Sequence, residues 1–356
     1  MLDKVKQGCS IGNEMNKEDT IVIDGSKGEG GGQIFRSSLT LAMCLGKAVC
    51  INNIRAGRSN PGLLRQHLTC LKAAKEICDA SVEGESLGSK KVVFIPGKVK
   101  SGKYHFSVGT AGSSTLIFQT ILMPLLLSAG KSEVILEGGT HNTMAPTFNF
   151  ISKSFLPILK VMGCEVNVEL KKYGFYPAGG GKWCAEISPA SKLKKLALID
   201  GGDLADISAH VISSKIPRHV TDRELSQIKK RCGIPDDSLH QQLVESAGPG
   251  NVVSLSVSEE SHEVIFEAFG EKNVSAERVA NKAINAWYKF KDANVPICEH
   301  LADQLILPMI LGSGGVYRTT KPTMHLLSNI DVVKSITGAS IDVAQVDDLS
   351  WEITVT

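Results

Sequence analysis

The chain has 356 residues, of which 42% are hydrophobic and 21% are charged, and its formal net charge is +2. This length exceeds one average domain, so we expect either two domains or one repeated architecture. No run of about 18 apolar residues is present, which excludes a membrane-spanning helix. The nine cysteines include no Cys-X-X-Cys pair, which disfavours a zinc or redox motif and favours reduced, cytosolic thiols.

The first segment of the chain is residues 1–19. They are mostly polar and lack the apolar stretch of a signal peptide. We therefore expect a flexible polar leader, a cytoplasmic location and a folded chain that begins at residue 20.

A strand, a glycine-rich loop and a helix are predicted next, in the stretch IVIDGSKGEGGGQIFRSS, residues 21–38. This order of elements can hold phosphate at a helix N-terminus, although a tight structural turn would give the same pattern. The loop matches neither the Walker sequence nor Gly-X-Gly-X-X-Gly. Glu29 lies among the glycines, where it can be a metal ligand, a general base or a carboxylate favoured by the helix dipole.

The segment between Glu29 and Glu76 contains no acidic residue but seven lysines and arginines. Such a run is often a solvated surface. Here, several arginines fall in the stretch RAGRSNPGLLRQH, residues 55–67, whose glycines and proline are typical of a loop. Guanidinium groups in a loop match the geometry of phosphate oxygens, so the segment favours a polyanionic partner.

The chain also shows a weak internal period of about 85 residues. One helix-like run recurs at residues 31–47, 112–131 and 300–315. A second recurs at residues 61–83, 145–170 and 323–345. The spacing between the second and third copies is longer than between the first and second, which predicts an inserted domain.

We therefore predict an α/β (α+β) fold in which three repeated βαβαββ-like units form a large domain. This domain comprises residues 20–199 and 294–356. A smaller α+β domain, residues 200–293, is inserted between units two and three.

Six stretches taken together resemble the RNA 3′-terminal phosphate cyclases. They follow one another in order from residue 21 to the end of the chain: DGSKGEGGGQIFRSSLTL, RAGRSNPGLLRQHL, GTAGSSTLIFQT, GFYPAGGG, HLADQLILPM and HLLSNI. The resemblance implies the fold predicted above. It also implies an enzyme that uses ATP to act on RNA with a 3′-terminal phosphate.

In the reaction that the resemblance implies, ATP adenylates an enzyme histidine and pyrophosphate is released. AMP then passes to the RNA 3′-phosphate, giving RNA-(3′)pp(5′)A, and the neighbouring 2′-hydroxyl attacks to form a 2′,3′-cyclic phosphodiester and AMP. This order is chemically sound because a phosphate monoester lacks a good leaving group, which adenylation supplies. A covalent intermediate divides the difficult transfer into easier steps.

The stretch KPTMHLLSNI, residues 321–330, puts His325 near the start of a predicted helix, because Pro322 and Thr323 are helix-start signals. A histidine on an apolar run is more often a core residue with a satisfied partner. In the first turn, however, the helix dipole disfavours the imidazolium and helps to keep a ring nitrogen unprotonated. The resemblance implies that His325 is the adenylated nucleophile.

The resemblance also implies a nucleotide site. Its predicted ATP contacts are Gln119, Pro146, His300, Leu301, Ala302, Asp303 and Gln304. Taken alone, an Asp-Gln pair at a helix start is ordinary capping chemistry. His300 stands where the family usually has tyrosine, and its imidazole can still stack on adenine.

Contacts to the ATP phosphates and the RNA end are implied for Arg36, Arg55, Arg58, Gln66 and His67. Some of these side chains could instead form surface or inter-unit ion pairs. Glu29 is implied to bind a divalent ion, Mg²⁺ or Mn²⁺, with a structural carboxylate as the alternative. Lys27 lies close enough in sequence to assist the departure of pyrophosphate.

Two other functions are compatible with parts of this pattern. A non-catalytic relative that binds RNA during ribosome assembly should share the fold but lack the histidine nucleophile. An enolpyruvyl transferase built on similar repeats would not explain HLADQ and HLLSNI together. His325, Glu29 and the arginine loop favour the enzyme, while the physiological RNA, the preferred metal, the oligomeric state and the role of the insert stay open.

Overall fold

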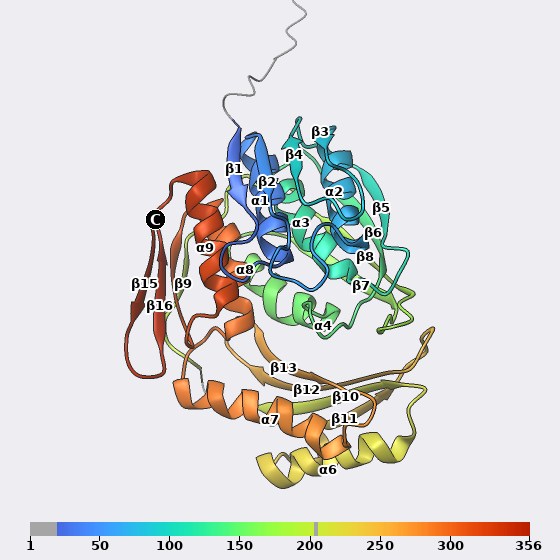
Figure 1. Cartoon of the computed structure of the whole chain (residues 1–356). Coiled ribbons are helices and arrows are strands. Elements are labelled where there is room, and N and C mark those ends of the chain that lie inside the picture. The colour runs from blue at the N-terminus through green and yellow to red at the C-terminus, as the bar shows by residue number, and fades with distance from the viewer. Residues whose placement is uncertain (1–19, 203–205) are drawn as a thin grey trace, which may run out of the picture.

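The computed structural model describes residues 20–202 and 206–356 (Figure 1). The predicted leader, residues 1–19, lies outside the described residues. The mixed α/β fold class is confirmed, since helices pack against four separate four-stranded sheets. Within the described ranges, no helix is both long enough and apolar enough to cross a membrane.

The first sheet follows the glycine-rich segment. Its strands, in sheet order, are β1 (Ile21–Asp24), β2 (Val49–Asn52), β4 (Val92–Ile95) and β3 (Ser81–Glu83). Its helices are α1 (Gly32–Leu45) and α2 (Arg65–Cys78). β1 and β2 are parallel, and the remaining pairs are antiparallel.

The second and third sheets have the same strand order and the same pattern of parallel and antiparallel pairs. The second contains β5 (Lys103–Ser107), β6 (Ser132–Gly138), β8 (Gly181–Ile187) and β7 (Val166–Lys172). The third contains β9 (Leu196–Leu198), β14 (Gly315–Thr319), β16 (Trp351–Val355) and β15 (Ile341–Gln345). That the three arise from one repeated unit stays a prediction.

The helices of these two sheets lie between the sheets, and we call the three sheets with their helices the body. They are α3 (Ser114–Leu126), α4 (Phe148–Phe150), the π-helical turn η2 (Ile151–Phe155), α5 (Leu156–Val161), α8 (Glu299–Ile310) and α9 (Met324–Thr337). Nearly every side chain of α3 is buried, because this helix is apolar on all sides and touches α1 and α2 as well as its own sheet.

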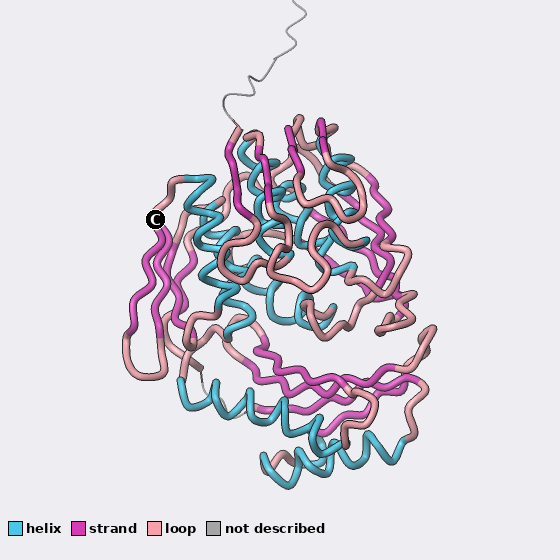
Figure 2. Tube along the Cα trace, viewed as in Figure 1, coloured by secondary structure: helices cyan, strands magenta, loops and turns pink. Residues whose placement is uncertain are grey.

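The fourth sheet lies within the predicted insert, and we call it the insert sheet. Its strands, in sheet order, are β11 (Leu239–Leu243), β10 (Ile207–Ser214), β12 (Gly250–Ser258) and β13 (Glu263–Phe269). Its helices are α6 (Arg218–Cys232), the short η3 (Asp236–Ser238) and α7 (Ala276–Ala293). Figure 2 shows this sheet between the body and the two long helices, which cover its outer face. The boundaries of the inserted domain, residues 200 and 293, stay a prediction.

Polar contacts join the insert sheet to the body at β13. Both carboxylate oxygens of Glu267 lie 2.9 Å from Thr147 Oγ1, whose hydroxyl also caps α4 by accepting from the Phe150 amide. Lys153 Nζ donates to Glu263 at 3.1 Å, and Ser154 Oγ donates to the Glu263 carbonyl at 2.6 Å. Burial raises the pKa of Glu267 to about 7, while the hydrogen bonds from Thr147 and Ser254 oppose that shift.

Replacing Glu267 with Gln should flatten the pH dependence of stability. The unfolded carboxyl group loses its proton near 4.5, whereas the folded one keeps it up to about 7. The folded state therefore binds the extra proton, and its stability falls as pH rises through this interval. We expect urea unfolding at pH 5 and pH 8 to show a difference smaller by on the order of 1 kcal/mol in Glu267→Gln than in the wild type.

Glu245→Gln, at an exposed position in the same predicted domain, is the matched control and should keep the wild-type difference. An unchanged difference in Glu267→Gln would show that the carboxyl group is already ionised at pH 5 in the folded protein.

Candidate active site

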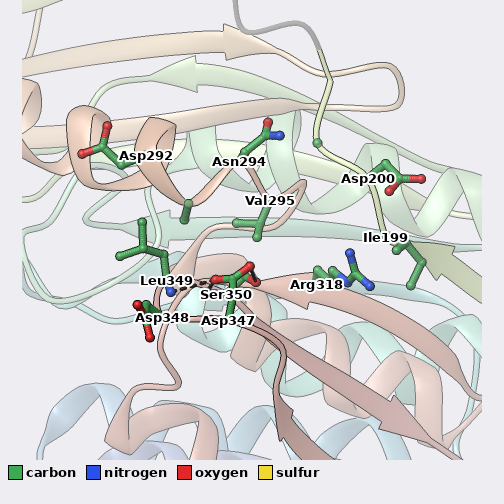
Figure 3. Close-up of a pocket in the computed structure, with 12 residues that line it drawn as sticks. Ile199, Asp200, Asp292, Asn294, Val295, Arg318, Asp347, Asp348, Leu349 and Ser350 are labelled. Atoms are coloured by element: carbon green, nitrogen blue, oxygen red, sulfur yellow. Dashed lines mark hydrogen bonds between the residues drawn. The ribbon is translucent and has the colours of Figure 1, made fainter.

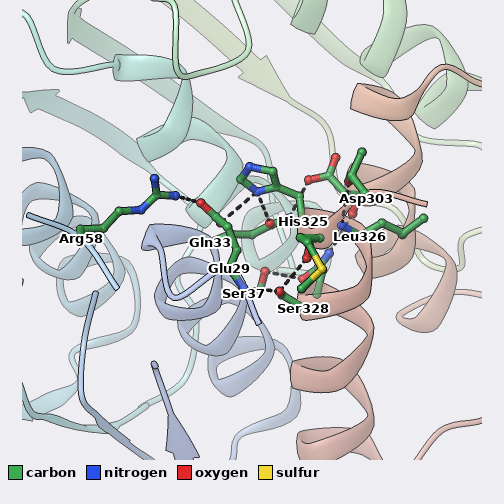
Figure 4. A network of polar contacts seen from close by, with 11 residues as sticks. Glu29, Gln33, Ser37, Arg58, Asp303, His325, Leu326 and Ser328 are labelled. Carbon is green, nitrogen blue, oxygen red and sulfur yellow. Dashed lines mark hydrogen bonds and ion pairs between the residues drawn. The ribbon is translucent and has the colours of Figure 1, made fainter. Parts of the chain in front are cut away.

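His325 lies in the first turn of α9, as the helix-start signals predict. Thr323 caps the helix, because its hydroxyl accepts from the Leu326 amide at 3.2 Å. The His325 side chain is 52% exposed, so it is not a core residue. Its Nδ1 lies 2.9 Å from Gln33 Oε1 and 3.0 Å from Glu29 Oε2 (Figure 4). Among the described residues, every hydrogen bond and ion pair of this ring is made by Nδ1, which leaves Nε2 available to a ligand.

The glycine-rich loop holds Glu29 beside His325. The backbone amide of Glu29 donates to Ser328 Oγ on α9 at 2.9 Å. At Gly28, where φ is +55°, a Cβ atom would lie 2.1 Å from that oxygen, so a side chain there would separate the loop from the helix. One oxygen of the Glu29 carboxylate pairs with Arg58 and the other faces His325. The loop thus holds a carboxylate between a cation and an imidazole.

Gln33 is a site residue that sequence reasoning missed. It lies in the first turn of α1, where its Nε2 donates to Asp303 Oδ2 at 2.7 Å while its Oε1 faces His325. Asp303 belongs to α8, so one amide side chain bridges α8 and α9. Its place in the first turn of the helix that follows the glycine-rich loop is a local signal that could have found it.

A second layer of hydrogen bonds lies beneath this bridge. Ser37 Oγ donates to Asn329 Oδ1 at 2.7 Å, and Asn329 Nδ2 donates to the backbone carbonyl of Asp303 at 2.8 Å. These bonds tie α1 to α9 and α9 to α8. They fix the spacing of the three helices that carry Gln33, Asp303 and His325.

The surroundings favour a neutral imidazole at His325. Partial burial lowers its pKa, and although the Asp303 carboxylate opposes this shift, the charges of Arg36 and Arg58 reinforce it. Burial raises the pKa of Asp303, while His325, Gln33, His300 and Arg36 favour its ionised form. Near neutral pH the ring therefore offers a lone pair on one nitrogen.

Arg36, His67 and the N-terminus of α1 converge at Gly32. A Cβ atom built on Gly32 would lie 2.5 Å from His67 Nε2 and 2.9 Å from Arg36 Nη1, so only glycine fits there. His67 Nδ1 accepts from the Leu64 amide at 3.3 Å, which puts the ring proton on Nε2. Burial, reinforced by Arg36 and Arg55, lowers the pKa of His67 to about 3. The cluster presents a guanidinium and an N–H donor at a helix N-terminus, an arrangement suited to an anion.

The other predicted phosphate contacts lie at the edges of this cluster. Arg55 is buried, and its Nη1 donates to the carbonyl oxygens of Asn60 and Gly62, so it supports its own loop. Gln66 Oε1 accepts from the Ser113 amide at 3.2 Å, at the N-terminus of α3. Lys27 is exposed on the glycine-rich loop.

The structure brings several predicted ATP contacts together around α8. Gln119 Nε2 donates to Gln304 Oε1 at 2.5 Å, and Gln304 Nε2 donates to the His300 carbonyl at 3.1 Å. His300 is exposed at the start of the helix. The carbonyl of Pro146 accepts from Thr115, next to the start of α3.

Leu301 and Ala302 differ from these residues. Their side chains are fully packed in the core, and Tyr317 Oη donates to the Ala302 carbonyl at 2.6 Å. Their backbone amides both donate to the Cys298 carbonyl, at 3.1 and 3.0 Å, so a contact from either residue to a nucleotide stays a prediction.

The predicted metal site has one carboxylate. In residues 20–202 and 206–356, no group of three or more His, Cys, Asp or Glu side chains is arranged to hold an ion. Mg²⁺ is commonly held by one or two carboxylates together with substrate phosphates and water. Glu29 fits that pattern as a single protein ligand, and its role as a ligand stays a prediction.

A cavity of about 500 Å³ lies elsewhere, where the chain enters and leaves the insert (Figure 3). Its described lining includes the carboxylates of Asp200, Asp292, Asp347 and Asp348, and Arg318 is the one basic side chain among them. The negative lining disfavours a polyphosphate. None of the predicted site residues lines this cavity, so it is separate from the candidate active site.

Comparison with known proteins identifies the family. The sequence model of the family described as "RTC: RNA 3'-terminal phosphate cyclase" matches residues 27–343. A protein of Koribacter versatilis (strain Ellin345) named RNA 3'-terminal phosphate cyclase is 46% identical over 326 residues, which are 91% of this chain and 92% of that protein. A solved structure, the enolpyruvyl transferase NikO from Streptomyces tendae, aligns with 94% of this chain and 65% of its own at 9% identity and a TM-score of 0.29, too low to carry an argument. The chain belongs to the RNA 3′-terminal phosphate cyclase family.

Proposed function

We propose that the protein converts the 3′-terminal phosphate of an RNA into a 2′,3′-cyclic phosphodiester, with ATP as co-substrate and AMP and pyrophosphate as products. Membership of the family supports the general reaction. The observation that carries the mechanism is the neutral, half-exposed His325, whose Nδ1 is occupied by two acceptors and whose Nε2 is free.

In the first step, Nε2 of His325 attacks the α-phosphorus of ATP. A P–N bond forms, the P–O bond to pyrophosphate breaks, and pyrophosphate leaves with the electron pair. The ring keeps its proton on Nδ1 and becomes cationic. Glu29 Oε2, 3.0 Å from Nδ1, stabilises that charge electrostatically.

In the second step, an oxygen of the RNA 3′-phosphate attacks the phosphorus of the histidine-AMP adduct. The P–N bond breaks, the ring returns to its neutral form, and RNA-(3′)pp(5′)A results. In the third step, the 2′-hydroxyl gives its proton to solvent and its oxygen attacks the 3′-phosphorus. The P–O bond to AMP breaks, which closes the cyclic phosphodiester.

The remaining residues bind and orient the substrates in this proposal. Arg36, Arg58, His67 and the N-terminus of α1 bind phosphate groups, with Arg55 and Gln66 shaping the surrounding loops. The adenosine lies against His300, Gln304, Gln119 and Pro146. Asp303 contacts the nucleotide less directly, because Gln33 occupies one of its oxygens.

Labelling with ATP that carries ³²P at the α-position tests the nucleophile. We expect the wild-type protein, incubated with Mg²⁺ or Mn²⁺, to retain label on denaturing gels, and His325→Ala to retain none. His105→Ala is the matched control, because His105 is a similarly exposed histidine on β5 that pairs with Glu137. Label on His325→Ala at the wild-type level would assign the nucleophile to another residue.

Arginine substitutions test phosphate binding. A cation aimed at developing phosphoryl charge is commonly worth about 100-fold in rate, so we expect Arg36→Ala and Arg58→Ala to slow histidine adenylation by about that factor. Arg278→Ala, on the exposed face of α7, should leave the rate unchanged. Equal rates in all three variants would place the triphosphate away from the cluster at Gly32.

Removal of the metal tests the cofactor. The Glu29 carboxylate and the triphosphate are both anionic, so a divalent ion held by Glu29 would supply the positive charge that lets them lie close together. We expect EDTA to abolish adenylation, and excess Mg²⁺ or Mn²⁺ to restore it in the wild type but poorly in Glu29→Ala. Full activity in EDTA would remove the metal from the proposal.

A further inference from the structure

We propose that Gln33 is a positioning residue for His325. Its amide nitrogen donates to Asp303 and its amide oxygen accepts from the imidazole, which holds the ring proton on Nδ1 and keeps the lone pair on Nε2. The inference rests on the proposed role of His325 as the nucleophile. It adds to that role a side chain that selects which ring nitrogen is nucleophilic.

The two ends of the Gln33 amide are chemically different, and Asp303 decides which way they point. Gln33 Nε2 donates to Asp303 Oδ2 at 2.7 Å, so the amide nitrogen faces a carboxyl oxygen that accepts its hydrogen bond. The opposite end of the amide is then Oε1, which lies 2.9 Å from His325 Nδ1. An acceptor at this distance requires a proton on Nδ1.

Glu29 also requires a proton on His325 Nδ1. Its Oε2 lies 3.0 Å from Nδ1 and is also an acceptor. Glu29, however, belongs to a loop and its carboxylate is shared with Arg58, whereas Gln33 belongs to a helix and is fixed at both ends. Because Asp303 holds the amide nitrogen, the Gln33 oxygen stays at Nδ1, so Gln33 specifies the same tautomer as Glu29 from a fixed position.

Further hydrogen bonds hold together the three helices that carry Asp303, Gln33 and His325. Ser37, Asn329 and the Asp303 carbonyl form a continuous hydrogen-bonded layer across α1, α9 and α8. Ser37 and Asn329 are buried, so water does not compete for these bonds. The layer keeps Asp303 and the imidazole at the separation that one glutamine side chain spans.

The position of the His325 ring proton matters for the first chemical step. The neutral imidazole free in water favours the proton on the distal nitrogen, Nε2, which would block the proposed nucleophile. Moving that proton to Nδ1 makes Nε2 the nucleophile, and the Gln33 carbonyl remains a hydrogen-bond partner when the ring gains charge. An incorrect tautomer of a catalytic histidine elsewhere costs up to about 10⁴-fold in kcat.

The test uses Gln33→Met, which keeps the length of the side chain and removes both polar ends. Single-turnover adenylation with α-labelled ATP should show a rate constant at saturating ATP that is at least about 10-fold lower. The half-saturating ATP concentration should be nearly unchanged, because the loss is in the nucleophile and not in nucleotide binding. Long-range ¹H–¹⁵N spectra of histidine-labelled protein, with the His325 signals assigned from His325→Ala, should show the proton on Nδ1 in the wild type and a shift toward Nε2 in the variant.

Two further variants separate this role from a structural one. Ser37→Ala removes a bond between the same helices without touching the amide, so it should lower the melting temperature but leave the tautomer spectrum of His325 unchanged. Gln33→Glu combined with Asp303→Asn exchanges the acid and the amide. This pair still presents an acceptor to Nδ1, so at saturating ATP it should adenylate faster than Gln33→Met.

The outcomes are distinguishable. If the wild type does not label at His325, the proposed function fails before Gln33 is tested. If the wild type labels, but Gln33→Met matches it in kcat and in the His325 spectrum, Gln33 is not a positioning residue and Glu29 alone sets the tautomer. If Gln33→Met does not fold, the exchanged pair decides, and a proton on Nε2 in that pair would overturn the inference.

Discussion

The hydrogen-bonded contact between α1, α8 and α9 is the constraint on which the candidate active site depends. The three helices come from opposite ends of the chain, and hydrogen bonds of 2.7 and 2.8 Å join them through Ser37, Asn329 and the Asp303 carbonyl. The glycine-rich loop joins the same contact through Ser328. Each helix or loop of the site is therefore held in place by contacts to another element that is distant in the sequence.

The electrostatic character of the site follows from this packing. Burial and neighbouring arginines act together on His325 and His67, so both imidazoles have lowered pKa values. A neutral imidazole can act as a nucleophile or as a hydrogen-bond donor. A cationic imidazole has no free lone pair and cannot act as a nucleophile. The positive charge is carried by guanidinium groups, which stay ionised at any working pH.

The insert contributes to the architecture but not to the described chemistry. Every side chain assigned to the candidate active site belongs to the body, whereas the insert sheet is attached through Glu263 and Glu267 on β13. The acidic cavity at the junction is lined by residues of both the insert and the body, and none of the predicted site residues lines it.

The features that depend on neighbours along the chain could be predicted from the sequence alone. The fold class and the helix start at Thr323 follow from sequence patterning and capping groups, which act over a few residues. Anion binding by the segment after Glu29 stays a prediction. The packing of Leu301 and Ala302 in the core could not be predicted, since it depends on helices contributed by other units. The same holds for the link between Gln33 and His325, which lie 292 positions apart. Which nitrogen of that ring is left free was decided only by the tertiary structure, because hydrogen-bond partners are chosen by distance in space and not by position in the sequence.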